Sequence, residues 1–209
     1  MTVDNRVLIV TGAAGNLGAA VAVELNRRGA RLVCVDYAAK ALEPLESSLS
    51  PAAGLLTLSG LDLTKLEDAQ KMVAAALDKF GRVDALVNTV GGFRMAPAED
   101  ALKDWDFLMN INARAALATS AAVAPAMKQR KFGRIVHIAA GAGMKGGAEM
   151  SVYSAAKAAV MRITESLAEE LSADGVTANC ILPGTIDTPQ NRAAMPEADT
   201  SRWVPPSDI

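Results

Sequence analysis

Short apolar segments rich in β-branched residues alternate with longer segments of helical periodicity along the whole chain. Six of the short segments have the length and composition of strands, at residues 6–10, 31–35, 55–58, 83–87, 134–138 and 177–182. Helices are expected between them, at residues 19–28, 40–49, 64–80, 99–130 and 152–171. Such alternation builds a mostly parallel sheet with helices on both faces. The sequence therefore predicts an α/β fold with one doubly wound parallel sheet of the Rossmann type.

Length and composition narrow the class of protein. A chain of 209 residues that is 51% hydrophobic is expected to be a single domain over residues 1–209. A net charge of -2 with scattered basic residues predicts no nucleic-acid or membrane partner. Cys34 and Cys180 lie in apolar runs, which favours buried thiols in a reducing compartment, and His137 is expected to be structural, so no metal site is predicted. Without a leader or an apolar span, a cytoplasmic location is expected.

The ends of two expected helices carry local signals. Thr64 followed by Glu67 has the pattern of a capping box, and Gly81 is expected to end that helix. The helical stretch 99–130 is expected to be interrupted near Pro125, because proline removes a main-chain hydrogen bond.

A glycine-rich turn follows the first strand directly and leads into the first helix. Such a turn lets backbone amides approach a diphosphate, and the helix N-terminus adds partial positive charge. The residues expected to contact the phosphates are Gly12, Ala14, Gly15, Asn16, Leu17 and Gly18. Asp36 ends the second strand, where a carboxylate suits the ribose of NAD and repels the 2′-phosphate of NADP. NAD(H) is therefore expected in preference to NADP(H), the alternative being a plain turn beside a solvated carboxylate.

Other strands also end in residues suited to ligand binding, since doubly wound sheets bind ligands at the carboxyl ends of their strands. A second flexible turn follows the fourth strand at residues 88–92, and an acidic residue follows the third. The further cofactor contacts expected there are Asp62, Leu63, Asn88, Val90 and Gly91.

Tyr153 and Lys157 lie four residues apart near the start of the last long helix, so they share one helix face. A phenol has a pKa of about 10 and is a poor acid or base at neutral pH, but a nearby ammonium favours the phenolate. The pair therefore predicts a general acid or base, although a Tyr and a Lys at this spacing also occur by chance on solvated helices.

These residues resemble the ordered motifs of the short-chain dehydrogenases/reductases. The resemblance extends over the chain and rests on Thr11-Gly12 with Gly18, Asp62, Asn88 with Gly91, Asn112, Tyr153 with Lys157, and Pro183-Gly184. It implies that Tyr153 exchanges a proton with a small-molecule substrate, that Lys157 binds the nicotinamide ribose and lowers the tyrosine pKa, and that Asn112 holds a relay water. It also implies a homodimer or homotetramer, and cofactor contacts from Pro183, Gly184, Thr185, Ile186 and Thr188.

Three features depart from the family pattern. Asn16 stands where the family has glycine, and its tolerance of left-handed backbone is expected to preserve the turn. Ala140 replaces the serine that hydrogen-bonds the substrate oxygen in the family. The chain stops about where the family's last helix begins, so the terminal helix and the seventh strand are expected to be missing.

The segment after Pro183-Gly184 resembles the C-terminal part of dihydropteridine reductases, a branch that also lacks the serine. The resemblance rests on the residues at 187–189, 191–192, 195–199, 203 and 205. It implies reduction of quinonoid dihydropterin, with a carbonyl or alcohol substrate or a non-catalytic dinucleotide sensor as the alternatives. The expected substrate pocket consists of Gly92, Phe93, Ala140, Met144, Met150, Met195 and Trp203.

Overall fold

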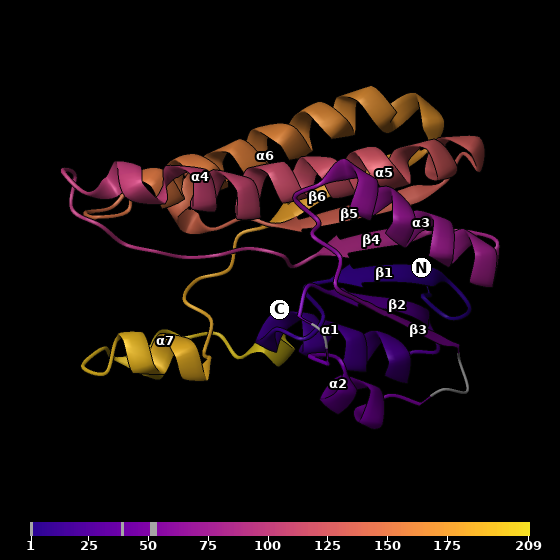
Figure 1. Cartoon of the computed structure of the whole chain (residues 1–209), viewed down its shortest axis with the longest axis horizontal. Helices are drawn as coiled ribbons and strands as arrows, with labels where there is room; N and C mark the ends of the chain where they lie inside the picture. The colour runs from indigo at the N-terminus through magenta and orange to yellow at the C-terminus, as the bar shows by residue number, and fades with distance from the viewer. Residues whose placement is uncertain (1, 39, 51–53) are drawn as a thin grey trace.

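The protein folds around a six-stranded parallel sheet, shown in Figure 1 by a computed structural model that describes residues 2–38, 40–50 and 54–209. The strand order is β3-β2-β1-β4-β5-β6, and each neighbouring pair is parallel. The strands are β1 (Val7–Thr11), β2 (Arg31–Asp36), β3 (Leu55–Ser59), β4 (Ala85–Asn88), β5 (Gly133–Ile138) and β6 (Val176–Ile181). The predicted doubly wound α/β fold is therefore confirmed, with the switch in strand order between β1 and β4.

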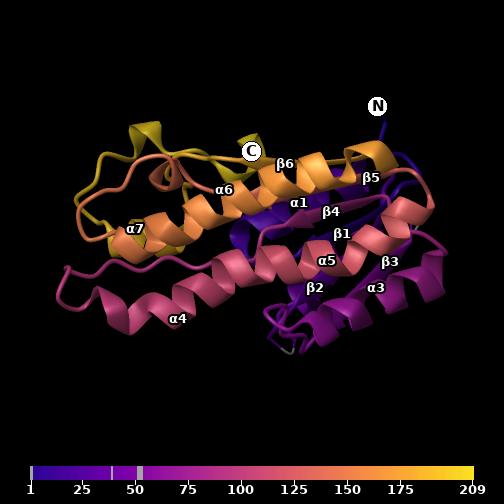
Figure 2. The ribbon, with the colours of Figure 1, turned by 90° about the horizontal axis from the view of Figure 1, so that it is seen from above.

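Helices cover both faces of the sheet, as Figures 1 and 2 show. On one side lie α3, α5 and α6, and on the other lie α1 and α2. The helices are α1 (Asn16–Arg27), α2 (Glu43–Ser48), α3 (Leu66–Phe80), α4 (Trp105–Leu108), α5 (Ala115–Gln129), α6 (Ser151–Leu171) and α7 (Pro189–Ala194). No helix in the described part of the chain is both long and apolar enough to cross a membrane.

Two hydrophobic clusters sandwich the sheet, because successive side chains of a strand point to opposite faces. In β1, Val7 and Ile9 join the cluster beneath α3, α5 and α6. The alternate residues Leu8 and Val10 join the cluster beneath α1 and α2. All four are at most 4% exposed, which explains why the strand reads as one continuous apolar run.

Two predicted helix signals are wrong, although Gly81 does end α3 in the left-handed conformation, with φ 71°. The helix begins at Leu66, and Lys65 at its N-cap makes no side-chain capping bond. The Thr64 hydroxyl donates instead to the Asp62 carboxylate at 2.6 Å, since that acceptor lies two residues away. The chain also continues as helix through Pro125, and the irregular segment is a π-helical stretch at Met109–Arg114.

A chain of buried polar side chains crosses the sheet from β1 to α5. The Thr11 hydroxyl donates to Asn88 Oδ1 at 2.5 Å, Asn88 Nδ2 lies 3.3 Å from His137 Nδ1, and His137 Nε2 lies 2.9 Å from the Ser120 hydroxyl. An amide nitrogen only donates, so Nδ1 accepts and the imidazole proton is on Nε2. Burial lowers the pKa of His137 to about 4, so the ring is neutral at neutral pH.

We predict that His137 makes the protein less stable in mild acid. The folded state lowers the pKa of this histidine from 6.5 to about 4. Its contribution to the free energy of unfolding is therefore fully present above pH 6.5 and is lost as the pH falls toward 4. Between pH 7 and pH 4.5 the loss should be about 2 to 3 kcal/mol, measured by urea unfolding. His137→Asn keeps a donor and an acceptor without titrating, so its stability should fall less over this range; an equal fall in both proteins would contradict the prediction.

Candidate active site

A cavity of about 530 Å³ opens at the carboxyl ends of the strands, beside the switch in strand order. Its walls come from the glycine turn, the ends of β2 and β3, the turn after β4 and the π-helical segment. The lining residues are Gly12, Ala14, Gly15, Asp36, Tyr37, Leu61, Asp62, Leu63, Thr64, Thr89, Val90, Gly91 and Ile111. The cavity therefore lies where doubly wound sheets bind nucleotides.

The glycine turn is held in place by its own packing and by Thr89, which follows the neighbouring strand β4. Gly12 has φ +65°, and a Cβ there would lie 3.0 Å from the Thr89 hydroxyl. That hydroxyl donates to the Thr11 carbonyl at 2.7 Å. At Gly18 a Cβ would lie only 2.1 Å from the Gly12 carbonyl oxygen, so glycine is required there for the helix to pack against the turn.

Asn16 does not adopt the left-handed backbone conformation that asparagine tolerates. It is the first residue of α1, and the residues with positive φ in the described chain do not include it. Gly15 precedes it at the N-cap, where no side chain is available to cap the helix. The first main-chain N–H groups of α1 therefore have no capping side chain, which suits them to an anionic ligand.

Two carboxylates line the first cavity beside the glycine turn, at the end of β2 and in the chain after β3. Asp36 accepts a hydrogen bond from the Ala14 amide at 3.0 Å, so the end of β2 is tied to the turn. Hydrogen bonding from Thr64 holds the pKa of Asp62 below its ordinary value, and Asp62 is therefore ionised. Tyr37 follows Asp36 and is 70% exposed, which leaves its ring on the cavity wall.

A second cavity of about 610 Å³ adjoins the first and shares Thr89 and Gly91 with it. Its walls come from the turns after β4, β5 and β6, from the start of α6 and from α7. The lining residues are Leu17, Thr89, Gly91, Gly92, Phe93, Met95, Ile138, Ala139, Ala140, Gly141, Ala142, Met150, Tyr153, Lys157, Pro183, Gly184, Thr185, Ile186, Asn191 and Met195. Because they share two lining residues, the two cavities together form one elongated site along the carboxyl ends of the strands.

Tyr153 and Lys157 both line the second cavity, from the first two turns of α6. Lys157 Nζ donates to the Ile138 carbonyl at 2.8 Å, and burial lowers the pKa of this lysine to about 8. Burial also raises the pKa of the Tyr153 phenol. The expected lowering of the tyrosine pKa is therefore not observed in the protein alone, because the ammonium is directed at Ile138 and lies 5.9 Å from the centroid of the phenol ring.

The ring of Tyr153 is positioned by the turn after β4. Phe93 meets it edge to face, with the centroids 4.8 Å apart and an interplanar angle of 82°. The next residue, Arg94, pairs with Asp104 at 2.6 Å and lies 3.8 Å above the Phe107 ring, which ties this turn to the α4 region. Such aromatic contacts restrict the phenol to one side of the cavity.

Asn112 lies in the π-helical segment and is 1% exposed. Its amide donates to the Leu108 and Gly92 carbonyls at 2.9 and 3.0 Å, and its oxygen accepts from the Gly92 amide at 3.2 Å. The side chain thus clamps the turn after β4. At Gly91 a Cβ would lie 3.0 Å from the Asn112 oxygen and 3.3 Å from Lys157 Nζ, so glycine allows both groups to approach this turn.

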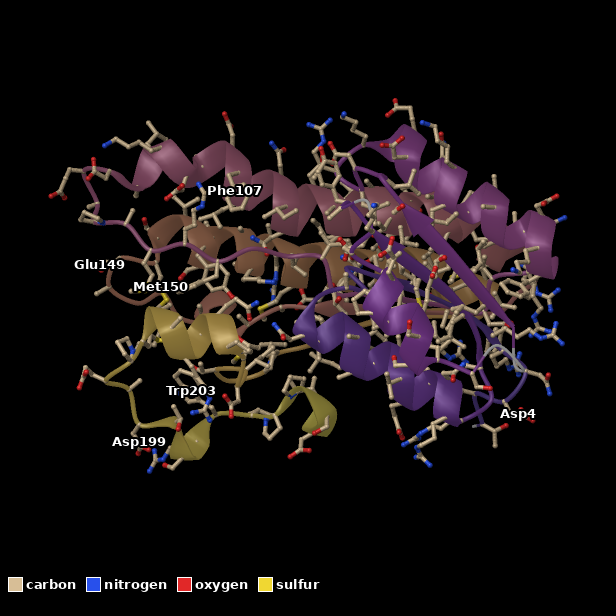
Figure 3. All side chains as sticks on the ribbon, turned by 60° about the horizontal axis from the view of Figure 1, so that its bottom comes forward. Asp4, Phe107, Glu149, Met150, Asp199 and Trp203 are labelled. Carbon is tan, nitrogen blue, oxygen red and sulfur yellow. The ribbon has the colours of Figure 1, made fainter. Side chains whose placement is uncertain are left out.

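Several residues expected at the site lie outside both cavities. Asn88 is buried in the polar chain that crosses the sheet, Thr188 caps α7 by accepting from the Asn191 amide at 3.1 Å, and Met144 is 74% exposed. In Figure 3, Met150 lies on one side of α7 and Trp203 on the other. The expected residues that line neither cavity are Asn16, Gly18, Asn88, Asn112, Met144, Thr188 and Trp203.

The structure also brings in residues that were not expected. Seven of them directly adjoin a residue that was expected at the site: Tyr37, Leu61, Thr64, Thr89, Ile111, Ala139 and Gly141. Ile138 is the last residue of β5, a strand that the sequence predicted. The other three come from segments where the sequence has no periodic signal: Met95, Ala142 and Asn191.

Comparison with protein families gives one match that covers most of the chain. The family model described as short chain dehydrogenase matches residues 6–199. A (2S)-[(R)-hydroxy(phenyl)methyl]succinyl-CoA dehydrogenase subunit of Thauera aromatica is 35% identical over 200 residues, which is 95% of this chain and 80% of that protein. An uncharacterized oxidoreductase of Staphylococcus aureus is 31% identical over 211 residues, covering 100% of this chain and 90% of that protein.

Solved structures of similar proteins share the fold. Levodione reductase matches with a TM-score of 0.87 and 30% identity, covering 95% of this chain and 78% of that one. NAD+-bound xylitol dehydrogenase matches with a TM-score of 0.87 and 29% identity, covering 100% of this chain and 83% of that one.

Proposed function

The chain belongs to the short-chain dehydrogenase/reductase family, and from this premise we propose that it is an NADH-dependent reductase of quinonoid dihydropterin. The choice of substrate rests on the presence of alanine at position 140. Its methyl group lines the cavity together with Tyr153 and Lys157. The corresponding position of the family carries a serine hydroxyl that holds the substrate oxygen. The choice of substrate therefore depends on which reaction a site without that donor serves best.

The elongated site supports a dinucleotide cofactor. The uncapped start of α1 and the glycine turn are suited to the diphosphate, and Asp36 is suited to a ribose with both hydroxyls free. Lys157 is placed to bind the second ribose, from the same cavity as Tyr153. A nicotinamide dinucleotide bound there would supply the hydride.

Proton transfer is assigned to Tyr153. Its phenol lines the cavity in the neutral form, since burial raises its pKa, and a neutral phenol can donate a proton to a substrate that accepts hydride. Phe93 and the first turn of α6 restrict the ring to this orientation. A non-catalytic sensor is less well supported, because a sensor does not need a tyrosine and a lysine placed together in the cavity.

Reduction of a quinonoid dihydropterin requires fewer hydrogen-bond donors in the site than reduction of a simple ketone. Reduction of a ketone concentrates negative charge on one oxygen, and loss of one donor to such an oxygen costs about 10² to 10³ in rate. Hydride and proton are added to the pterin across a conjugated C=N system, so charge spreads over the heterocycle. Apart from Lys157, the described residues that line the second cavity carry no charged side chain. A flat, neutral ring between Phe93 and Met195 is consistent with that lining.

A small carbonyl or alcohol is the second candidate substrate. The similar proteins named above include levodione reductase and xylitol dehydrogenase, whose names state such substrates. Tyr153 could donate a proton in that reaction equally well. The argument against a carbonyl substrate is therefore only that Ala140 has no hydroxyl to donate to the substrate oxygen.

Cofactor choice can be tested at Asp36. The wild type should use NADH with a kcat/KM at least about tenfold above that for NADPH, because the carboxylate repels the 2′-phosphate. Asp36→Ala should narrow this gap, whereas Glu67→Gln, which changes an exposed carboxylate on α3, should not. Equal kcat/KM values for the two cofactors in the wild type would refute the assignment.

The role of the tyrosine and lysine predicts a large loss of rate. Tyr153→Phe and Lys157→Met should each lower kcat by about 10² or more, since one removes the acid and the other removes the cation beside it. Circular dichroism should show that both variants remain folded. Turnover by Tyr153→Phe close to that of the wild type would exclude this phenol as the proton donor.

The substrate assignment is tested by Ala140→Ser. The added hydroxyl should raise kcat/KM for a simple ketone by about tenfold or more, while reduction of quinonoid dihydropterin should change little. Assays with NADH and both substrates provide the comparison. A wild type that ignores pterins and reduces a ketone rapidly would favour the second candidate.

We also propose that the protein is a homodimer or homotetramer that assembles through its helical face. Exposed apolar side chains lie on α4 and α5, where Trp105, Phe107 and Leu117 are 40% to 49% exposed. Light scattering should give the mass of two or four chains, and Leu117→Arg should shift it toward one. A strictly monomeric wild type would contradict this proposal.

A further inference from the structure

Residues 185–204, which we call the covering segment, form a small unit held together by their own contacts. Ile186 and Val204 form a parallel bridge, and the Asp187 amide donates to the Val204 carbonyl at 2.9 Å. The Arg192 guanidinium donates to both oxygens of the Asp187 carboxylate, at 2.6 and 2.8 Å. These contacts join α7 to the bridge between Ile186 and Val204.

The covering segment forms one wall of the second cavity. Asn191 and Met195 line that cavity, and the side-chain amide of Asn191 donates to the Ile186 carbonyl at 2.8 Å. In Figure 3, α7 lies next to Met150, which lines the same cavity from the start of α6. The position of α7 therefore determines how closely a substrate is enclosed.

One hydrogen bond attaches the covering segment to the dinucleotide half of the protein. Asn16 Nδ2 donates to Gln190 Oε1 at 2.8 Å, from the first residue of α1 to α7. Across the described residues, no other hydrogen bond or ion pair joins the covering segment to the rest of the chain. Asn16 stands where the family has glycine, which has no side chain to make this bond.

Asn16 also adjoins the place where an anionic ligand would bind. Gly15 lines the first cavity and Leu17 lines the second, so Asn16 lies between the two lining positions on either side. Its main-chain N–H belongs to the uncapped first turn of α1, which attracts negative charge. A diphosphate that fixes this turn would also fix the backbone from which the Asn16 amide reaches Gln190.

We propose that the hydrogen bond between Asn16 and Gln190 couples dinucleotide binding to closure of the covering segment over the substrate. Both residues are then positioning residues, since neither lines a cavity and each acts through the segment. The inference rests on the proposed dinucleotide-dependent activity. Because this hydrogen bond joins two exposed side chains, it belongs in the lower part of the usual range, about 0.5 to 1 kcal/mol, so its loss should weaken closure by about 2- to 5-fold.

Hydrogen exchange of the wild type, with and without ADP-ribose, tests the coupling directly. ADP-ribose carries the diphosphate without the nicotinamide, so this measurement needs no turnover. Binding should slow exchange both in the glycine turn, residues 12–18, and in residues 185–204. In Asn16→Ala and Gln190→Ala the glycine turn should still be protected, while protection of the covering segment should fall by about 2- to 5-fold.

Kinetics with variants separate coupling from a general loss of structure. Both alanine variants should raise the KM for substrate by about 2- to 5-fold with little change in kcat, and the double variant should be no worse than either single one. Glu197→Ala, at an exposed position of the same segment, is the matched control and should behave like the wild type.

The possible outcomes distinguish failure of the coupling from failure of the proposed dinucleotide-dependent function. Unchanged protection of residues 185–204 in both alanine variants, with the glycine turn still protected, would overturn the coupling alone. Failure of ADP-ribose to protect residues 12–18 in the wild type would overturn the proposed dinucleotide-dependent function and the coupling with it.

Discussion

The buried chain of hydrogen bonds from Thr11 through Asn88 and His137 to Ser120 fixes the centre of this structure. It joins β1, β4 and β5 at the level where the chain leaves the sheet in the two turns that line the cavities. Buried polar groups without partners are costly, so a shift of one residue in any of these strands would break the chain. The same bonds therefore hold the glycine turn and the turn after β4 in register with each other.

The sheet was predictable from the sequence because both of its faces are buried. Strands such as β1 then read as uninterrupted apolar runs, and their ends were predicted to within a few residues. The helix signals failed where a side chain had a better partner nearby. Thr64 bonds to Asp62 rather than capping α3, and the packing of α5 keeps the chain helical through Pro125.

The candidate site was predictable where it depends on the ends of strands. Asp36 and Gly91 line the cavities because the parallel sheet brings every carboxyl end to one edge. Met95 and Asn191 come from segments without periodicity, and their arrival in the cavity depends on tertiary contacts far along the chain. Asn112 shows a further limit, since the π-helical turn that places its amide on Gly92 has no signal in the sequence.

The difference between the expected and observed tyrosine pKa follows from where the Lys157 ammonium is directed. The ammonium has three N–H donors, and the Ile138 carbonyl accepts from it at 2.8 Å, while burial alone lowers its pKa to about 8. Ribose hydroxyls in the same cavity would add acceptors for the remaining donors, which favours the charged lysine. A charged lysine in turn favours the phenolate of Tyr153. The tuning that the sequence implied is absent from the protein alone, and under the proposed function we expect it in the complex with the dinucleotide.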